Sequence, residues 1–148
     1  MKAPDMKAVG YIRVSTAQQA DEGHSIDAQR SKIEQYAALY DLDMLHIYTD
    51  EGASGKTMDR DGLSAALNAV ETGEAEAIVV VKLDRLTRSV ADLNVLLEKY
   101  FAEGAPASLV SVSEQINTDS AAGRLVLNVL MSVSQWEREV ISERTSEA

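Results

Sequence analysis

A serine and an arginine lie two residues apart at the end of the first predicted strand. The run from Lys7 to Val14 is rich in β-branched and aromatic residues, and Ser15 follows it at once. Residues i and i+2 of a strand point to the same face, so Arg13 and Ser15 share one. A serine at such a place is usually a turn former. Beside an arginine, which binds phosphate oxygens bidentately, it can also be a nucleophile directed at a phosphate.

A second group of charges follows the third predicted strand. The segment from Lys82 to Arg88 contains three cations and one carboxylate, Asp84, directly after the apolar run Ala77 to Val81. Arg85 and Arg88 are three residues apart, so a helical turn would place both on one face. Such a charge run is usually a solvated loop with an internal ion pair. Its position at the end of an apolar strand allows a second interpretation, a phosphate-binding cluster.

Four arginines are predicted at strand ends or in the long loop: Arg13, Arg60, Arg85 and Arg88. Guanidinium groups without acidic partners repel one another, unless the cluster serves to stabilise a dianionic transition state. No histidine lies near Ser15 in the sequence, so a Ser-His-Asp triad has no support. The pattern favours attack on a phosphodiester by a serine within an arginine cluster.

Two nucleotide-binding motifs can be set aside. The segment Gly52 to Thr57 resembles a phosphate-binding loop, but Asp50 stands where that motif needs its first glycine. The helix that should follow the threonine at once is also delayed by three residues. No G-x-G-x-x-G pattern is present, so dinucleotide binding has no support either.

Composition bounds the class of protein. The chain has 148 residues, 45% of them hydrophobic and 26% charged, which is typical of one globular domain with or without an appendage. The net charge of −10 argues against a surface that coats nucleic acid. Cysteine is absent and only two histidines occur, so we expect no metal and no cofactor. No apolar run approaches a membrane span and no signal-peptide core is present, so we expect a cytoplasmic protein.

Strand and helix patterns alternate along the chain. This order predicts the α/β class, with a central, mostly parallel sheet covered by helices and with active groups beyond the carboxyl ends of the strands. The predicted elements are strand Lys7 to Val14, helix Ser25 to Leu42, strand Met44 to Thr49, loop Asp50 to Asp59, helix Gly62 to Thr72, strand Ala77 to Val81, a helix from Ser89 through Phe101, and strand Ser108 to Val112.

A long helix is predicted from Ala121 to the end of the chain. A helix of roughly 26 residues would be about 39 Å long, more than a small domain covers. It either packs along its own domain or, as we favour, projects and buries its apolar stripe against a partner subunit. The chain ends inside this pattern, so we expect a fragment of a longer protein. The stripe consists of Leu125, Val126, Val129, Leu130, Val133, Trp136, Val140 and Ile141.

Four blocks of this sequence resemble the serine recombinases, the family of resolvases, invertases and large serine integrases. Their order and spacing match over essentially the whole chain. The stretch Glu22 to Gln29 is more similar to the large integrase and transposase branch than to the small resolvases. The four blocks are Tyr11 to Thr16 with Gln19, Asp50 to Gly55 with Asp59 and Arg60, Lys82 to Arg88, and Glu137-Arg138 with Glu143 to Thr145.

The resemblance implies a reaction. Ser15 would attack a DNA phosphodiester, leaving a 5′-phosphoserine bond and a free 3′ hydroxyl, while Asp84 would orient the arginines or take part in proton transfer. A covalent intermediate conserves the bond energy, so neither ATP nor a metal is required. The phosphate-binding arginines would be Arg13, Arg85 and Arg88, helped by Arg60. Further site positions implied by the resemblance are Gln19, Tyr11, Asp50, Lys82, Arg138, Glu143 and Arg144. The base that deprotonates Ser15 is not evident.

The resemblance also implies a domain plan and partners. Residues 1–120 would form the catalytic domain, and residues 121–148 a dimerisation helix that leads onto the DNA minor groove. A DNA-binding region would follow outside this chain. The family works as a dimer on each site and as a tetramer in the synapse, where half of the tetramer rotates about a flat apolar interface. Trp136 would belong to that surface or would instead pack within its own chain. The other residues of the surface would be Val126, Val129, Leu130 and Val133.

Two other function classes fit the sequence less well. A receiver-type signalling module needs an acidic cluster after the first strand and a phosphorylatable aspartate after the third. Here the first strand ends in Arg-Val-Ser, and Asp84 is adjacent to arginines. A recombinase fold that serves only for assembly is disfavoured because Ser15 and the arginines Arg13, Arg85 and Arg88 are all present.

Overall fold

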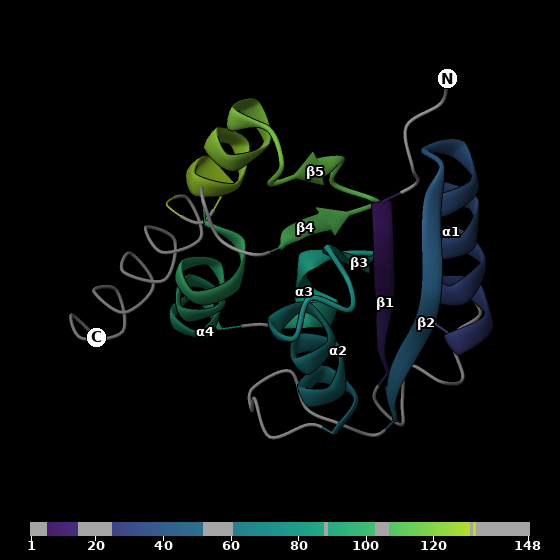
Figure 1. Ribbon diagram of the computed structural model, residues 1–148. Helices are drawn as coiled ribbons and strands as arrows, with labels where there is room; N and C mark the ends of the chain where they lie inside the picture. Colours follow the sequence, from purple (N-terminus) through teal and green to yellow (C-terminus); the bar gives the residue numbers. More distant parts are fainter. Residues whose placement is uncertain are drawn as a thin grey trace, which may run out of the picture.

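Five strands form one sheet at the centre of the molecule (Figure 1). The computed structural model describes residues 6–14, 25–51, 61–87, 89–102, 107–130 and 132. Neighbouring strands run parallel, except that the last pair is antiparallel. The predicted mostly parallel sheet is therefore confirmed. In spatial order the strands are β2 (Leu42–Glu51), β1 (Met6–Val14), β3 (Ala77–Val80), β4 (Ser108–Ser111) and β5 (Ile116–Asn117).

Helices cover both faces of this sheet, as a three-layer α/β arrangement requires (Figure 1). One helix packs on one face, where Ile33 meets residues of β1 and β3 such as Ile12 and Val79. The remaining helices pack on the opposite face, where Leu63 and Leu96 join one core. The helices are α1 (Ile26–Leu39), α2 (Asp61–Glu71), the single turn α3 (Leu83–Leu86), α4 (Val90–Leu96) and its π-helical continuation η2 (Leu97–Phe101).

Capping residues mark three of the helix ends. The Ser25 hydroxyl accepts from the Ala28 amide at 3.1 Å, and the Ser89 hydroxyl accepts from the Asp92 amide at 3.2 Å. Such side-chain caps satisfy amides that have no partner within the helix. Gly73 lies after α2 with φ of +84°, the left-handed conformation that ends many helices on glycine.

The first helix and β2 differ from their predicted bounds, and one strand was not predicted. The first helix ends at Leu39 and not at Leu42, because Asp41 adopts φ of +57° and the chain turns there into β2. β2 runs through Asp50 to Glu51, so the predicted loop begins two residues later than expected. β5 was not predicted at all, since two residues are too few to show a period.

The C-terminal helix is described over residues 121–130. Leu127 is only 1% exposed and joins the main core, while the Arg124 guanidinium donates to the Thr118 carbonyl at 2.8 Å. The first four residues of the predicted stripe are between 41% and 64% exposed: Leu125, Val126, Val129 and Leu130. The helix thus anchors itself through Leu127, a residue outside the predicted stripe. The rest of the stripe, Trp136 included, lies outside the described residues.

None of the helices in the described ranges is long and apolar enough to cross a membrane.

Candidate active site

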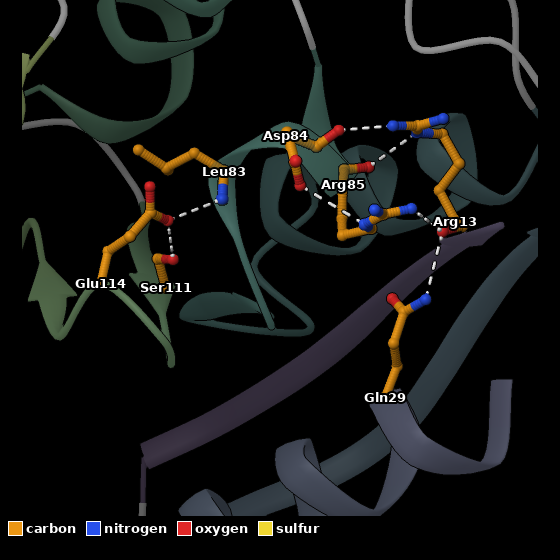
Figure 2. Close-up of polar contacts among 7 residues, drawn as sticks. All are labelled: Arg13, Gln29, Leu83, Asp84, Arg85, Ser111 and Glu114. Atoms are coloured by element: carbon orange, nitrogen blue, oxygen red, sulfur yellow. Dashed lines mark hydrogen bonds and ion pairs between the residues drawn. The ribbon is translucent and has the colours of Figure 1, made fainter. Parts of the chain in front are cut away.

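Arg13 is the largest of the side chains that are buried almost completely, with 1% of its surface exposed. It lies near the end of β1. Its guanidinium donates from Nε to the Arg85 carbonyl at 3.2 Å and from Nη2 to the Asp84 carbonyl (Figure 2). Each hydrogen bond to a charged group contributes about 1.5–3 kcal/mol. Desolvating an ion costs several kcal/mol, so the two carbonyl contacts offset much of the cost of burying this cation.

The carbonyls that hold Arg13 belong to α3. The last carbonyls of a helix have no partner within it. In this single turn, the Thr87 amide bonds the Leu83 carbonyl at 3.1 Å, and the next two carbonyls along the chain face Arg13. The turn therefore presents main-chain oxygens to the guanidinium, and the position of α3 determines the position of Arg13.

Arg85 returns the contact. Its Nη1 donates to the Arg13 carbonyl at 3.3 Å, and its Nε lies 3.3 Å from Asp84 Oδ1 (Figure 2). Arg85 is 3% exposed, whereas the Asp84 side chain is 49% exposed. The structure thus confirms that these two arginines lie together, and it shows Asp84 paired with one of them. We call Arg13 and Arg85, with the main-chain groups between them, the arginine pair.

Contacts within the arginine pair offset the repulsion between its two positive charges. Two guanidinium groups repel each other if nothing negative lies between them. Here each guanidinium donates to the other residue's carbonyl, and the Asp84 carboxylate lies against Arg85. These contacts fix the planes of both groups, so the cluster is stable before any phosphate arrives.

One correction concerns the helical turn after β3. The sequence allows Arg85 and Arg88 to share one face if a helical turn spans both. That arrangement needs a helix that continues to residue 88, and the structure does not provide it, because α3 ends at Leu86 and Thr87 is extended, with φ of −160° and ψ of 152°. The position of Arg88 itself lies outside the described residues. The three-residue spacing therefore does not continue as a helix beyond Leu86.

Gln29 is a site residue that sequence reasoning missed. It is buried on α1, and its Nε2 donates to the Arg13 carbonyl at 3.2 Å (Figure 2). The same carbonyl accepts from Arg85, so two layers of the fold meet at one backbone oxygen. Gln29 lies within the predicted helix Ser25 to Leu42, but nothing in the residue pattern indicates this contact.

Asp50 anchors the start of α2. Its carboxylate accepts from the Gly62 amide at 2.8 Å, from the Leu63 amide at 3.0 Å and from the Tyr11 hydroxyl at 2.7 Å. A Cβ at Gly62 would lie 2.9 Å from the Thr49 carbonyl oxygen, so only glycine allows this approach. Asp50 pairs in register with Arg13 across β1 and β2, and it fixes α2 beside the strand ends.

Lys82 lies at the start of α3 and its side chain is exposed. Seven further residues expected at the site lie outside the described residues: Ser15, Gln19, Arg60, Arg88, Arg138, Glu143 and Arg144. Within the described ranges, no three histidine, aspartate or glutamate side chains are grouped so that they could hold a metal ion.

Comparison with known proteins identifies the family. Residues 8–148 match the family described as "Resolvase, N terminal domain". The chain is 40% identical over 140 residues to the DNA-invertase Hin of Salmonella typhimurium, covering 95% of this chain and 65% of Hin. It is 39% identical over 144 residues to the transposon Tn3 resolvase of Escherichia coli, covering 96% and 69%. The chain therefore spans about two thirds of the length of these relatives.

Solved structures agree with this. The N-terminal catalytic domain of TP901-1 integrase matches with a TM-score of 0.78 and 37% identity, covering 90% of this chain and 98% of that one. A resolvase family site-specific recombinase from Streptococcus pneumoniae matches with a TM-score of 0.70 and 28% identity, covering 97% and 95%. With the arginine pair at the ends of β1 and β3, these matches show that the chain belongs to the serine recombinases and contains their catalytic domain.

Proposed function

We propose that this chain cuts and rejoins DNA at specific sites, with Ser15 as the nucleophile. One observation carries the proposal: the buried arginine pair lies where β1 and β3 end, and Ser15 is the residue that follows β1. Buried, hydrogen-bonded guanidinium groups are preorganised, so they stabilise a transition state without rearranging when it forms. Membership of the serine recombinases makes the receiver-type alternative unfavoured.

The proposed reaction exchanges one phosphoester bond for another. The Ser15 oxygen attacks the phosphorus of a DNA phosphodiester, and the bond from phosphorus to the 3′ oxygen breaks. The serine hydroxyl loses its proton and the departing 3′ oxygen gains one. Attack on the phosphoserine by the 3′ hydroxyl of another strand reverses these steps and releases Ser15. No net energy input is needed, because each step replaces one ester by another.

The arginines have separate roles in this scheme. Arg13 and Arg85 contact the non-bridging oxygens of the pentacovalent phosphorus, and Arg88 and Arg60 complete the set. Asp84 holds Arg85 in orientation. Gln19, Tyr11, Asp50, Lys82, Arg138, Glu143 and Arg144 support the site. For Asp50 and Tyr11, that support is best explained by their contacts with each other and with the first amides of α2.

Double-stranded DNA and further copies of this chain are the proposed partners. Residues 1–120 form the catalytic domain, and residues 121–148 a dimerisation helix followed by a DNA-binding region. The exposed side chains Leu125, Val126, Val129 and Leu130 support a subunit interface, since adjacent apolar residues exposed on one helix mark such surfaces. We propose a dimer on each DNA site, a tetramer during strand exchange, and the cytoplasm as the location.

Trapping of the covalent intermediate tests the nucleophile. The full-length protein, incubated with a half-site DNA that cannot rejoin, should form an adduct that survives denaturation. Ser15→Ala should abolish it, because an alanine has no oxygen to attack phosphorus. Ser113→Ala, an exposed serine elsewhere in the chain, is the matched control and should leave the adduct unchanged. An adduct that persists in Ser15→Ala would refute the assignment.

A binding measurement tests the domain plan. Residues 1–148 alone should bind DNA weakly and without sequence preference, because their net charge is −10 and phosphate is held only locally. Fluorescence anisotropy with specific and scrambled duplexes would check this. Tight, sequence-specific binding by this chain would contradict it.

A further inference from the structure

The N-terminal end of α3 is held by a glutamate from another part of the chain. Glu114 Oε1 accepts from the Leu83 amide at 2.8 Å, and the same oxygen accepts from the Ser111 hydroxyl (Figure 2). Leu83 and Glu114 are 31 residues apart in sequence. The Leu83 amide is one of the first amides of the turn, which need a partner from outside the helix.

Backbone pairing fixes Glu114 in this place. After β4, the chain continues beside the segment that follows β3: the Val112 amide bonds the Val80 carbonyl at 2.9 Å, and the Ser113 amide bonds the Val81 carbonyl at 2.8 Å. The turn then closes through Gln115, which adopts φ of +55°. Because these bonds are main-chain bonds, the Glu114 side chain is presented to α3 by the sheet itself.

The two ends of α3 have different partners. The N-terminal end bonds Glu114, and the C-terminal carbonyls bond the Arg13 guanidinium. A single helical turn has little stability of its own, so its placement depends on these end contacts and on the buried Leu83 and Leu86. A shift of α3 at one end therefore moves the carbonyls at the other end. Misplacement of catalytic groups by about 1 Å can cost roughly 100-fold in rate.

We propose that Glu114, assisted by Ser111, is a positioning residue for the arginine pair. It touches neither arginine. It accepts the Leu83 amide, sets the placement of α3, and so sets where the Asp84 and Arg85 carbonyls hold the Arg13 guanidinium. The inference rests on the proposed function, since activity is its main measure.

The test compares variants by their rate of adduct formation on half-site DNA at saturating concentration. Glu114→Ala removes the acceptor and should slow adduct formation by about 10- to 100-fold. Glu114→Gln keeps an oxygen at the same reach but loses the charge, and charged acceptors bond about twice as strongly as neutral ones. Glutamine should therefore restore the rate only in part, to a value between that of Glu114→Ala and that of the wild type. Ser113→Ala, in the same turn, should behave as the wild type.

Two further measurements separate positioning from general stability. The melting temperature of Glu114→Ala should fall by only a few degrees, and its affinity for DNA should match the wild type, so that the rate alone changes. In an Arg85→Lys background, Glu114→Ala should slow adduct formation only a little further, because the effects of groups that act through one shared partner are not additive. A structural role alone would give additive losses.

The outcomes are distinguishable. If the wild type forms no adduct, the proposed function fails. If the wild type forms it and Glu114→Ala does so at the same rate, the positioning role is wrong and the function stands. Should Glu114→Ala not fold, Glu114→Gln and Ser111→Ala decide, because each weakens the contact without removing it. Wild-type rates in both would overturn the proposal, and reduced rates with unchanged DNA affinity would support it.

Discussion

The arginine pair and the C-terminal helix differ in what completes them. The arginine pair is made of the most polar side chains in the protein, yet Arg13 and Arg85 are buried and bonded within one chain. The C-terminal helix carries apolar side chains, yet four of them face solvent. The usual rule for burial is reversed in both regions. The polar groups of the arginine pair find their partners within this chain, and for the exposed face of the helix we propose a partner subunit.

The largest expected effect comes from substitutions in the arginine pair. Arg13→Lys and Arg85→Lys should each slow adduct formation by about 100- to 1,000-fold, comparable to the loss of one oxyanion donor. An ammonium cannot reproduce the fixed fork of donors that each guanidinium presents. Arg30→Lys, at an arginine of α1, is the control. Near-normal rates in both variants would show that the pair is structural.

The next effect lies within the C-terminal helix and compares two neighbouring faces. Leu127→Ala should destabilise the chain by about 2–5 kcal/mol, because it opens a cavity in the core. Urea unfolding followed by circular dichroism would measure this.

Val129→Ala is the matched substitution on the exposed face. It should change the unfolding free energy by no more than about 0.5 kcal/mol, and it should weaken self-association in analytical ultracentrifugation. Equal losses of stability from the two substitutions would remove the distinction between the anchored and the unpartnered face.

A smaller effect concerns the start of that helix. A Cβ at Gly123 would lie 1.9 Å from the Asn117 carbonyl oxygen, whereas at Gly73 it would meet open space. Gly123→Ala should therefore cost about 1–3 kcal/mol through a forced backbone shift. Gly73→Ala should cost only about 1 kcal/mol, from its positive φ. The reverse order of unfolding free energies would mean that the helix does not pack against β5 as described.

The smallest effect is a pH dependence at Tyr36, a half-buried residue of α1 that packs against the core. Burial, and secondarily the neighbouring Tyr40, raises the pKa of Tyr36 above the usual tyrosine range. The folded state then holds the proton of the Tyr36 hydroxyl more tightly than the unfolded state does. The contribution of Tyr36 to the free energy of unfolding is therefore fully present below the unfolded pKa of about 10. It is lost as pH rises through the higher folded value. Unfolding midpoints should fall with pH in this range, and Tyr36→Phe should flatten the fall.

Much of this fold is predictable because its signals are local. Ser25 and Ser89 each cap the helix that follows, by accepting the amide three residues further on. The apolar run of β3 marks a strand buried on both faces. The clustering of Arg13 and Arg85 was also predictable, since parallel strands bring their carboxyl ends to one edge. These inferences need only a few residues of sequence at a time.

What could not be predicted depends on contacts between distant segments. The carbonyls of Asp84 and Arg85 accept from Arg13, which lies more than 70 residues away in the sequence. Main-chain acceptors of this kind cannot be predicted from a side-chain pattern. Nothing in the sequence distinguishes Glu114 from other acidic residues expected at the surface. The end of α3 before Arg88 was missed for a related reason, because the extended Thr87 interrupts the helical period without a glycine or proline.

The use of main-chain oxygens to hold Arg13 has a consequence for mutational robustness. Side-chain substitution at positions 84 and 85 leaves both carbonyl groups in the chain, so the holder of Arg13 cannot be deleted by a single point mutation. It can only be displaced, by substitutions that move α3. Substitutions that disturb the packing of Leu83 and Leu86 are therefore more damaging to the placement of Arg13 than substitutions of the polar side chains at positions 84 and 85. A transfer of this site into another scaffold would have to include both β1 and the whole α3 turn.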